Sequence, residues 1–166
     1  YVKERKEAHM LIEDLMLLAN RRVAFHLSKN FTKVPFVYRV HDTPDIQKLE
    51  EFGENAKRFG HKLKLDSPKN ISAELNRLMN DIKGKPEQNI LESLAIRCMA
   101  KAVYTTKNIG HYGLAFEHYT HFTSPIRRYP DLMVHRILAN VLDNHTLSYA
   151  NREQLEDKCR LSSDTA

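Results

Sequence analysis

Two adjacent arginines, Arg127 and Arg128, follow Thr123-Ser124-Pro125 at a point where the chain is expected to turn into a helix. Thr and Ser can cap such a turn and Pro suits its first position, so free backbone N–H groups are expected to point outward there. Cations at the positive end of a helix are unfavourable by about 0.3–1 kcal/mol each, and a sequence that tolerates two of them often binds an anion. Residues 123–128 therefore predict an anion site.

Arginine is well suited to a phosphate anion. Its planar guanidinium makes bidentate hydrogen bonds to phosphate oxygens and stays charged at any working pH. In phosphodiester hydrolysis, negative charge builds on the non-bridging oxygens, and a guanidinium that is already in place stabilises it. The spacing alone favours a plainer alternative, in which the arginines lie on a solvated face or pair with Asp131 and Glu117.

The elements around this turn are mostly helical. Apolar residues at helical spacing predict helices, whereas the β-branched and aromatic run at 36–40 predicts a short strand. Residues 103–124 contain aromatic-rich runs and predict short extended segments and loops. The expected helices span residues 4–29, 45–59, 72–82, 87–102 and 131–143. We expect an α/β (α+β) fold, predominantly helical with a few short strands, in one compact unit.

Three blocks of sequence, in order along residues 8–138, resemble the ribonuclease R and ribonuclease II family. The most specific block is Tyr119 to Arg136 (YTHFTSPIRRYPDLMVHR), which follows Gly110-His111-Tyr112-Gly113-Leu114. Ala8 to Asn20 resembles a family helix that carries an acidic pair before an apolar run. Tyr38 to Pro44 (YRVHDTP) lies between them, where the family has a similar element.

The resemblance implies a processive 3′-to-5′ exoribonuclease that hydrolyses single-stranded RNA to nucleoside 5′-monophosphates with Mg²⁺. It also implies roles for individual residues. Arg127 matches the arginine that contacts the scissile phosphate, and Arg128 beside it holds backbone phosphate. Thr123 and Ser124 match the turn that lines the site. Glu13 matches a glutamate that lines the RNA path, and Tyr119 matches an aromatic residue near the turn.

In this family the Mg²⁺ ligands come from an aspartate-rich motif in the N-terminal part of the catalytic domain, and this sequence contains no such cluster. Two-metal hydrolysis needs clustered carboxylates that hold ions about 3.5–4 Å apart. We therefore interpret residues 1–166 as the C-terminal portion of a single RNB-type catalytic domain, inactive by itself and exposing apolar surface. The expected partners are single-stranded RNA, the remainder of the catalytic domain and flanking RNA-binding domains.

Composition sets wider limits on location and partners. The chain carries 26 Lys and Arg against 21 Asp and Glu, a net charge of +5, which weakly favours a polyanionic partner. No apolar run approaches the roughly 20 residues of a membrane span, so no membrane partner is expected. Two cysteines, Cys98 and Cys159, form neither a disulfide framework nor a zinc motif, which favours a reducing cytoplasm.

Two metal-site alternatives receive less support from the sequence. The pair His41-Asp42 could belong to a metal-dependent phosphohydrolase, but no recognisable set of further ligands accompanies it, and Asp42 is better explained as a helix cap before Pro44. Four more histidines surround the arginines in sequence: His111, His118, His121 and His135. Surface or supporting roles are expected for them, with His121 as a candidate RNA contact.

A non-catalytic RNA-binding module, a degenerate relative of the enzyme, is the main functional alternative. Aromatic residues interleave with basic ones in the second half of the chain, which suits base stacking, although in a helical domain such residues more often fill a core. They are Tyr104, Tyr112, Phe116, Tyr119 and Phe122. An aspartate cluster upstream of Tyr1 would indicate an enzyme, and its absence would indicate a binder.

Overall fold

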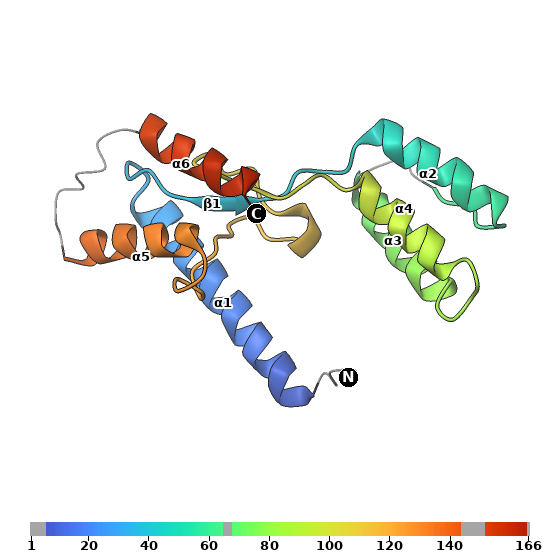
Figure 1. The fold of residues 1–166 in the computed structure, drawn as a ribbon, viewed down its shortest axis with the longest axis horizontal. Helices are drawn as coiled ribbons and strands as arrows, with labels where there is room; N and C mark the ends of the chain where they lie inside the picture. Colours follow the sequence, from blue (N-terminus) through green and yellow to red (C-terminus); the bar gives the residue numbers. More distant parts are fainter. Residues whose placement is uncertain (1–5, 65–67, 144–151, 166) are drawn as a thin grey trace. The chain divides into compact units, whose positions relative to one another are not determined.

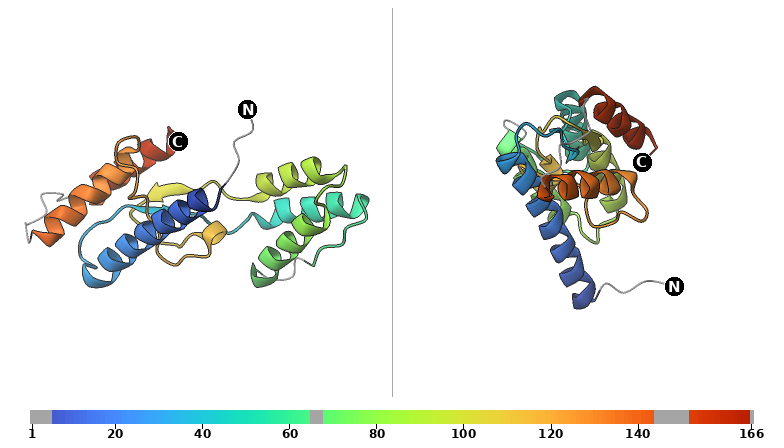
Figure 2. Two further views of the ribbon diagram at one scale, coloured as in Figure 1. Left: turned by 90° about the horizontal axis from the view of Figure 1, so that it is seen from below. Right: turned by 90° about the vertical axis from the view of Figure 1, so that its left-hand side faces the viewer.

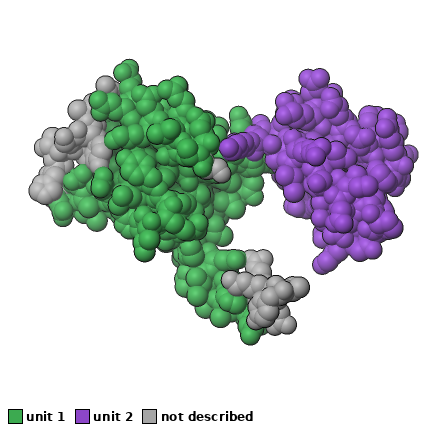
Figure 3. Space-filling model, in the orientation of Figure 1, with its two compact units in different colours: residues 1–42, 102–166 green, residues 43–101 purple. Residues whose placement is uncertain are grey.

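The computed structural model describes residues 6–64, 68–143 and 152–165. These form two compact units, residues 1–42 with 102–166 (unit 1) and residues 43–101 (unit 2), coloured separately in Figure 3. The expectation of one compact unit is therefore wrong for the described residues. The physical reason is that residues 43–101 have a hydrophobic core of their own. The assignment of residues 1–166 to one catalytic domain stays a prediction.

Unit 1 is built around a two-stranded antiparallel sheet. Strand β1 (Tyr38–Val40) pairs with β2 (Val103–Thr105), with Arg39 opposite Tyr104. Three helices complete unit 1, and α6 lies along the sheet (Figure 1). They are α1 (Glu7–Asn30), α5 (Tyr129–Leu142) and α6 (Arg152–Asp164), with a short 3₁₀ helix, η1, at Tyr112–Leu114.

The core of unit 1 lies where these elements meet. Helices α1, α5 and α6 and strand β1 each contribute apolar side chains to it, and these side chains cover one another from solvent. The largest fully buried members of this core are Leu27, Val37, Val40, Val134 and Ile137. This core fixes the beginning of α5, where the arginine turn is located.

Unit 2 consists of α2 (Ile46–Arg58), α3 (Pro68–Asp81) and α4 (Gln88–Cys98), which pack together in Figure 2. Their facing sides bury Leu49, Phe52, Leu78, Ile82 and Leu91. The N-cap of α2 is Asp45, whose carboxylate accepts the N–H of Lys48 at 3.2 Å. The expected cap at Asp42 is therefore wrong. Asp45 immediately precedes the helix and so reaches its free N–H groups.

The predicted helices agree with the structure except at some ends. The helix predicted over 87–102 ends at Cys98, because the backbone is already extended at Met99, ahead of the strand Val103–Thr105. The helix predicted from Ser72 begins at Pro68. The helix predicted from Asp131 begins at Tyr129, and Pro130 occupies its first turn, where no N–H is needed.

The N-terminal half of α1 exposes apolar side chains. The sequence predicted exposed apolar surface on this chain but did not predict its location. Leu11, Ile12 and Leu15 are 56–61% exposed. The same helix becomes buried only from Asn20 onward, at Ala24 and Leu27. Within the described ranges, no helix combines the length and the apolarity that crossing a membrane requires.

Candidate functional site

Residues 124–128 form a closed turn that leads into α5. The carbonyl of Ser124 accepts the N–H groups of both Arg127 and Arg128, at 3.3 and 3.1 Å. Arg128 is the N-cap residue of α5. Ile126, at the tip of the turn, is fully exposed. The predicted short turn at Ser124–Arg128 is thus present, and its tip projects into solvent.

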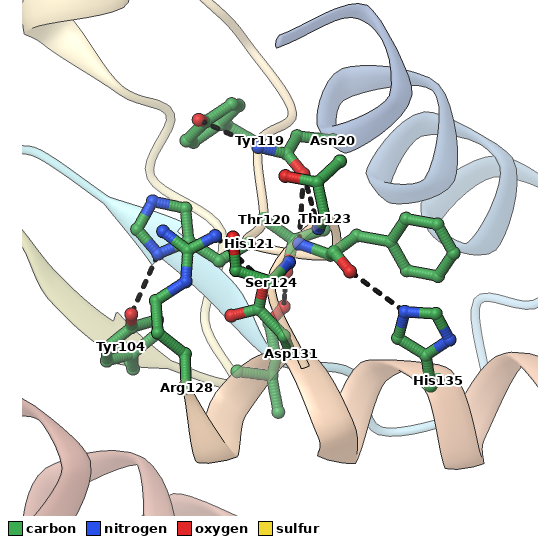
Figure 4. Close-up of polar contacts among 12 residues, drawn as sticks. Asn20, Tyr104, Tyr119, Thr120, His121, Thr123, Ser124, Arg128, Asp131 and His135 are labelled. Carbon is green, nitrogen blue, oxygen red and sulfur yellow. Dashed lines mark hydrogen bonds and ion pairs between the residues drawn. The ribbon is translucent and has the colours of Figure 1, made fainter. Parts of the chain in front are cut away.

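Two buried polar side chains hold the chain just before this turn (Figure 4). From α1, the Asn20 Oδ1 accepts the N–H groups of Phe122 and Thr123 at 2.9 and 3.2 Å. From α5, the Asp131 Oδ1 accepts the N–H of Ser124 at 2.7 Å. Three successive N–H groups are therefore bound inside the protein.

This bonding corrects the expectation that free N–H groups of the turn point outward. Among the N–H groups of residues 122–128, that of Ile126 is the one that has no hydrogen-bond partner among the described residues. Buried acceptors take the others because an unpaired buried N–H is costly. An anion at this turn would be held mainly by side chains.

The two arginines differ in their surroundings. The Arg128 Nη2 donates to the Asp131 Oδ1 at 2.8 Å, and its side chain is 22% exposed against 0% for Asp131. The alternative pairing with Asp131 is thus confirmed for Arg128. The Arg127 side chain is exposed and has no hydrogen bond or ion pair within the described ranges. Arg127 is therefore the guanidinium available to a ligand.

Tyr119 lies inside the protein, beside the turn. It is 5% exposed, and its hydroxyl accepts the Asn20 Nδ2–H at 3.2 Å. Its ring contacts the rings of His111, Phe116 and His121. In this structure Tyr119 supports Asn20, and its ring is covered by protein.

The remaining predicted residues lie at two places. Thr123 and Ser124 are half-buried in the turn, and the Thr123 Oγ1 is buried without a partner among the described residues. Glu13 is exposed on α1. It precedes Asn20 by two helical turns, on nearly the same face and about 10 Å away along the axis. The structure thus brings Thr123, Ser124, Arg127 and Arg128 together and leaves Glu13 outside the turn.

A cavity of about 310 Å³ opens beside the turn. Tyr104, Arg127 and Arg128 line it together with residues of α5 and α6. The guanidinium of Arg39 lies 4.5 Å from the centre of the Tyr104 ring. One wall of this cavity is therefore positively charged, as a phosphate ligand would require.

His121 is next to these positive charges. Its Nδ1 lies 2.8 Å from the Tyr104 hydroxyl. Burial and then the charges of Arg128 and Arg39 lower the pKa of His121 from 6.5 to about 4. His121 is therefore neutral near pH 7, and it is positioned by a hydrogen bond to Tyr104.

Other histidines also have structural partners. The His135 Nε2–H donates to the Phe122 carbonyl at 2.8 Å, and the two rings stack at 4.0 Å. The His41 Nδ1 accepts the N–H of Gly113 at 2.9 Å, and the Nδ1 of His118 accepts from Asn108 at 2.7 Å. These contacts favour supporting roles over a metal site at His41 or around the arginines.

The described residues do not fit a Mg²⁺ site. Over residues 6–64, 68–143 and 152–165, no group of three or more His, Cys, Asp or Glu side chains could hold a metal ion. The one buried carboxylate at the turn, Asp131, is paired with Arg128. Hard divalent cations bind to clustered oxygen ligands, so no catalytic step is assigned to a metal on this chain.

Sequence reasoning assigned no site role to Asn20 or Tyr104, and it named Asp131 only as a possible partner of the arginines, without its bond to Ser124. Asn20 could have been noticed as a polar residue on the apolar side of a predicted helix. Tyr104 gives no such signal, because its contact with His121 depends on the pairing of β1 with β2.

Comparison with protein-family models shows to which family this chain belongs. The model of the RNB domain matches residues 1–144. The chain belongs to the RNB domain family. It is 43% identical over 150 residues to Ribonuclease R of Aquifex aeolicus (strain VF5), covering 90% of this chain and 21% of that protein. The chain therefore spans about a fifth of the length of this curated relative.

Solved structures of RNB relatives share the fold. A structure of Mycoplasma genitalium RNase R in complex with ribose-methylated single-stranded RNA superimposes with a TM-score of 0.77 and 33% identity, covering 98% of this chain and 25% of that chain. The structure of yeast Ssd1, a pseudonuclease, has a TM-score of 0.75 and 27% identity, covering 97% of this chain and 20% of that chain. The RNB fold thus occurs in both a ribonuclease and a pseudonuclease.

Proposed function

We propose that this RNB domain is part of a processive 3′-to-5′ exoribonuclease that hydrolyses single-stranded RNA to nucleoside 5′-monophosphates in the cytoplasm. One observation carries the proposal. The Arg127 guanidinium is exposed and unpaired in the described structure, on a turn whose backbone is held from α1 and α5. Such a fixed cation suits the charge that develops on a phosphodiester during hydrolysis. The likeness to ribonucleases R supports this assignment.

Each side chain of the site has a distinct part in this proposal. Arg127 contacts the scissile phosphate, while Arg128 adds positive charge beside it from its pair with Asp131. Thr123 and Ser124 shape the turn, and Tyr119 acts from inside through Asn20. Glu13 contacts RNA further along α1. Sequence preference is expected to be low, because phosphate and sugar contacts carry little base information.

Mg²⁺ and the remaining parts of the site come from outside this chain in our proposal. The described residues lack a suitable ligand cluster. We propose that the metal ligands lie in the remainder of the same catalytic domain, and that flanking RNA-binding domains contact the substrate. The isolated chain of 166 residues is then expected to be inactive.

The deciding experiment is degradation of 5′-labelled single-stranded RNA by the full-length protein with Mg²⁺, comparing wild type with Arg127→Ala. We expect the wild type to shorten RNA from its 3′ end, and the variant to bind RNA but cut it about 10²–10³-fold more slowly. Arg136→Ala, which changes another α5 arginine outside the turn, is the matched control. Equal cutting by wild type and Arg127→Ala would remove Arg127 from the catalytic site.

A non-catalytic RNA-binding module is the second candidate function, and the likeness to the pseudonuclease Ssd1 specifically favours it. In that case the wild type would bind RNA in a salt-sensitive way without shortening it. The same assay therefore separates the two functions.

A further inference from the structure

We propose that Asp131 is a positioning residue, which does not contact RNA itself and acts by fixing the turn that carries Arg127. This inference rests on the proposed function and adds a residue to its site. Asp131 does not reach solvent, so it has no direct contact with a ligand. Its effect on RNA must pass through the groups that it binds.

The hydrogen bonds of Asp131 are connected to Arg127 through Ser124. Its Oδ1 accepts the N–H of Ser124 at 2.7 Å. The carbonyl of that same Ser124 accepts the N–H groups of Arg127 and Arg128. Ser124 is thus held at both its N–H and its C=O. The direction in which Arg127 leaves the turn depends on both bonds.

The second donor to Asp131 explains why the carboxylate can remain buried. The Arg128 Nη2 donates to the same Oδ1 at 2.8 Å, and the opposite charges offset the loss of hydration. The Oδ2 is buried with no partner among the described residues. Arg128 and the Ser124 N–H thus share one oxygen, and this couples the N-cap residue of α5 to the start of the turn.

Asn20 holds the other end of the same segment, at the N–H groups of Phe122 and Thr123. Removing Asp131 would therefore leave the segment attached to α1 and free Ser124 to move. Displacement of a catalytic group by about 1 Å is enough to lower a rate about 100-fold. A local shift of Arg127, without loss of the fold, is the expected result.

A double-mutant cycle in the full-length protein tests this mechanism. The variants are Asp131→Ala, Arg127→Ala and both together, with kcat and KM measured on single-stranded RNA. We expect Asp131→Ala to lower kcat about 30–100-fold in the wild type. In the Arg127→Ala background the same change is expected to lower kcat by a clearly smaller factor, because only its effect through Arg128 remains.

Two further variants separate positioning from general stability. Asp131→Asn keeps an oxygen that can accept from Ser124, and we expect it to retain most of the kcat lost in Asp131→Ala. Val141→Ala also empties a buried position of α5, away from the turn. It is expected to lower the melting temperature while kcat at a permissive temperature is unchanged.

The outcomes distinguish this inference from the proposed function. If Asp131→Ala lowers kcat equally in both backgrounds, or if Val141→Ala lowers it as much, Asp131 is not a positioning residue for Arg127. If the wild type does not cut RNA, the proposed function fails. In that case the double-mutant cycle is measured with the Kd for an RNA oligonucleotide. Non-additive losses of binding free energy support the positioning role of Asp131, and additive losses overturn it.

Discussion

The imidazole of His41 occupies the space that a side chain at residue 113 would need. A Cβ added to Gly113 would lie 2.8 Å from the His41 Nδ1, the same atom that accepts the Gly113 N–H at 2.9 Å. This contact joins the end of β1 to η1. It gives a physical reason for glycine at residue 113 that does not depend on its backbone angles.

Gly113→Ala is therefore expected to destabilise unit 1 by about 1–3 kcal/mol, because His41 must move. Thermal or urea unfolding measures the change. In a His41→Ala background the added methyl has no such neighbour, so the same substitution should be nearly neutral. An equal destabilisation in both backgrounds would show that the His41 contact is not the cause.

Substitution of the two arginines should affect stability differently. Arg128→Ala leaves the Asp131 carboxylate buried without its charged partner, and losses of about 3 kcal/mol are typical for that change. Arg127→Ala removes an exposed, unpaired side chain and should alter the free energy of unfolding by less than about 0.5 kcal/mol. Chemical denaturation of both variants checks this. Equal destabilisation would contradict the different environments seen here.

Glu156 should make the attachment of α6 sensitive to acid. It accepts the Thr105 Oγ1–H at 2.8 Å and both the N–H and Oγ1–H of Thr106 at 2.6 Å. Burial raises the pKa of Glu156, but these hydrogen bonds outweigh it, and the pKa is lowered overall. A lowered pKa means that the stabilisation is present at neutral pH and is lost as the pH falls through the folded-state value.

Glu156→Ala is expected to lower stability at pH 7 by about 1.5–3 kcal/mol, the range for hydrogen bonds to a charged group. The difference from wild type should shrink as the pH is lowered, since the wild type loses the same bonds. Asp157→Ala, which removes a carboxylate at an exposed position of the same helix, is the control. A difference that does not change with pH would rule out this role for Glu156.

Two buried histidines of unit 1, His111 and His121, should make the protein less stable below neutral pH. Burial lowers the pKa of both His111 and His121 from 6.5 to about 4. The unfolded chain therefore takes up protons between about pH 6.5 and 4 that the folded chain does not. Stability should fall in that window by at most about 1.4 kcal/mol per pH unit for each histidine, and by less where solvent screens the charge.

His121→Gln should flatten this pH dependence without removing it, because His111 still titrates. Melting temperatures across pH 4–7 provide the measurement. His26→Gln, at an exposed position of α1, controls for histidine replacement in general. An unchanged slope for His121→Gln would show that His121 is not one of the titrating groups.

Local sequence patterns predicted most helices and the turn at Ser124–Arg128. Both kinds of feature depend on residues that are close together in the sequence, as α1 and the Ser124 hydrogen bonds show. Features that depend on distant residues were not predictable. The pairing of β1 with β2, ahead of which α4 ends at Cys98, is one of them. The motif placed Tyr119 near the turn, but its buried contact with Asn20, far away in sequence, could not be read from the motif. No local signal distinguishes a buried tyrosine from a stacking one.

The different environments of Arg127 and Arg128 could also not be predicted from the sequence. Both are adjacent and equally basic, so the sequence predicted phosphate contacts for both. The helical spacing of Asp131 from Arg128 decides which arginine is paired. The contact of Asp131 with Ser124 fixes the turn on which the other arginine is exposed, and only the structure reveals that contact.

The insertion of unit 2 between β1 and β2 affects how the chain can fold. Val40 pairs with Val103, so residues 41–102 form the loop of one antiparallel strand pair. Closing a loop of that length as a flexible chain carries an entropic penalty that grows with its length. Within unit 2, however, the Asp45 N–H donates to the Cys98 carbonyl at 3.3 Å and ties its two ends together. Once unit 2 has folded, the flexible part of the connection between β1 and β2 is much shorter, and the entropic cost of pairing the two strands falls accordingly.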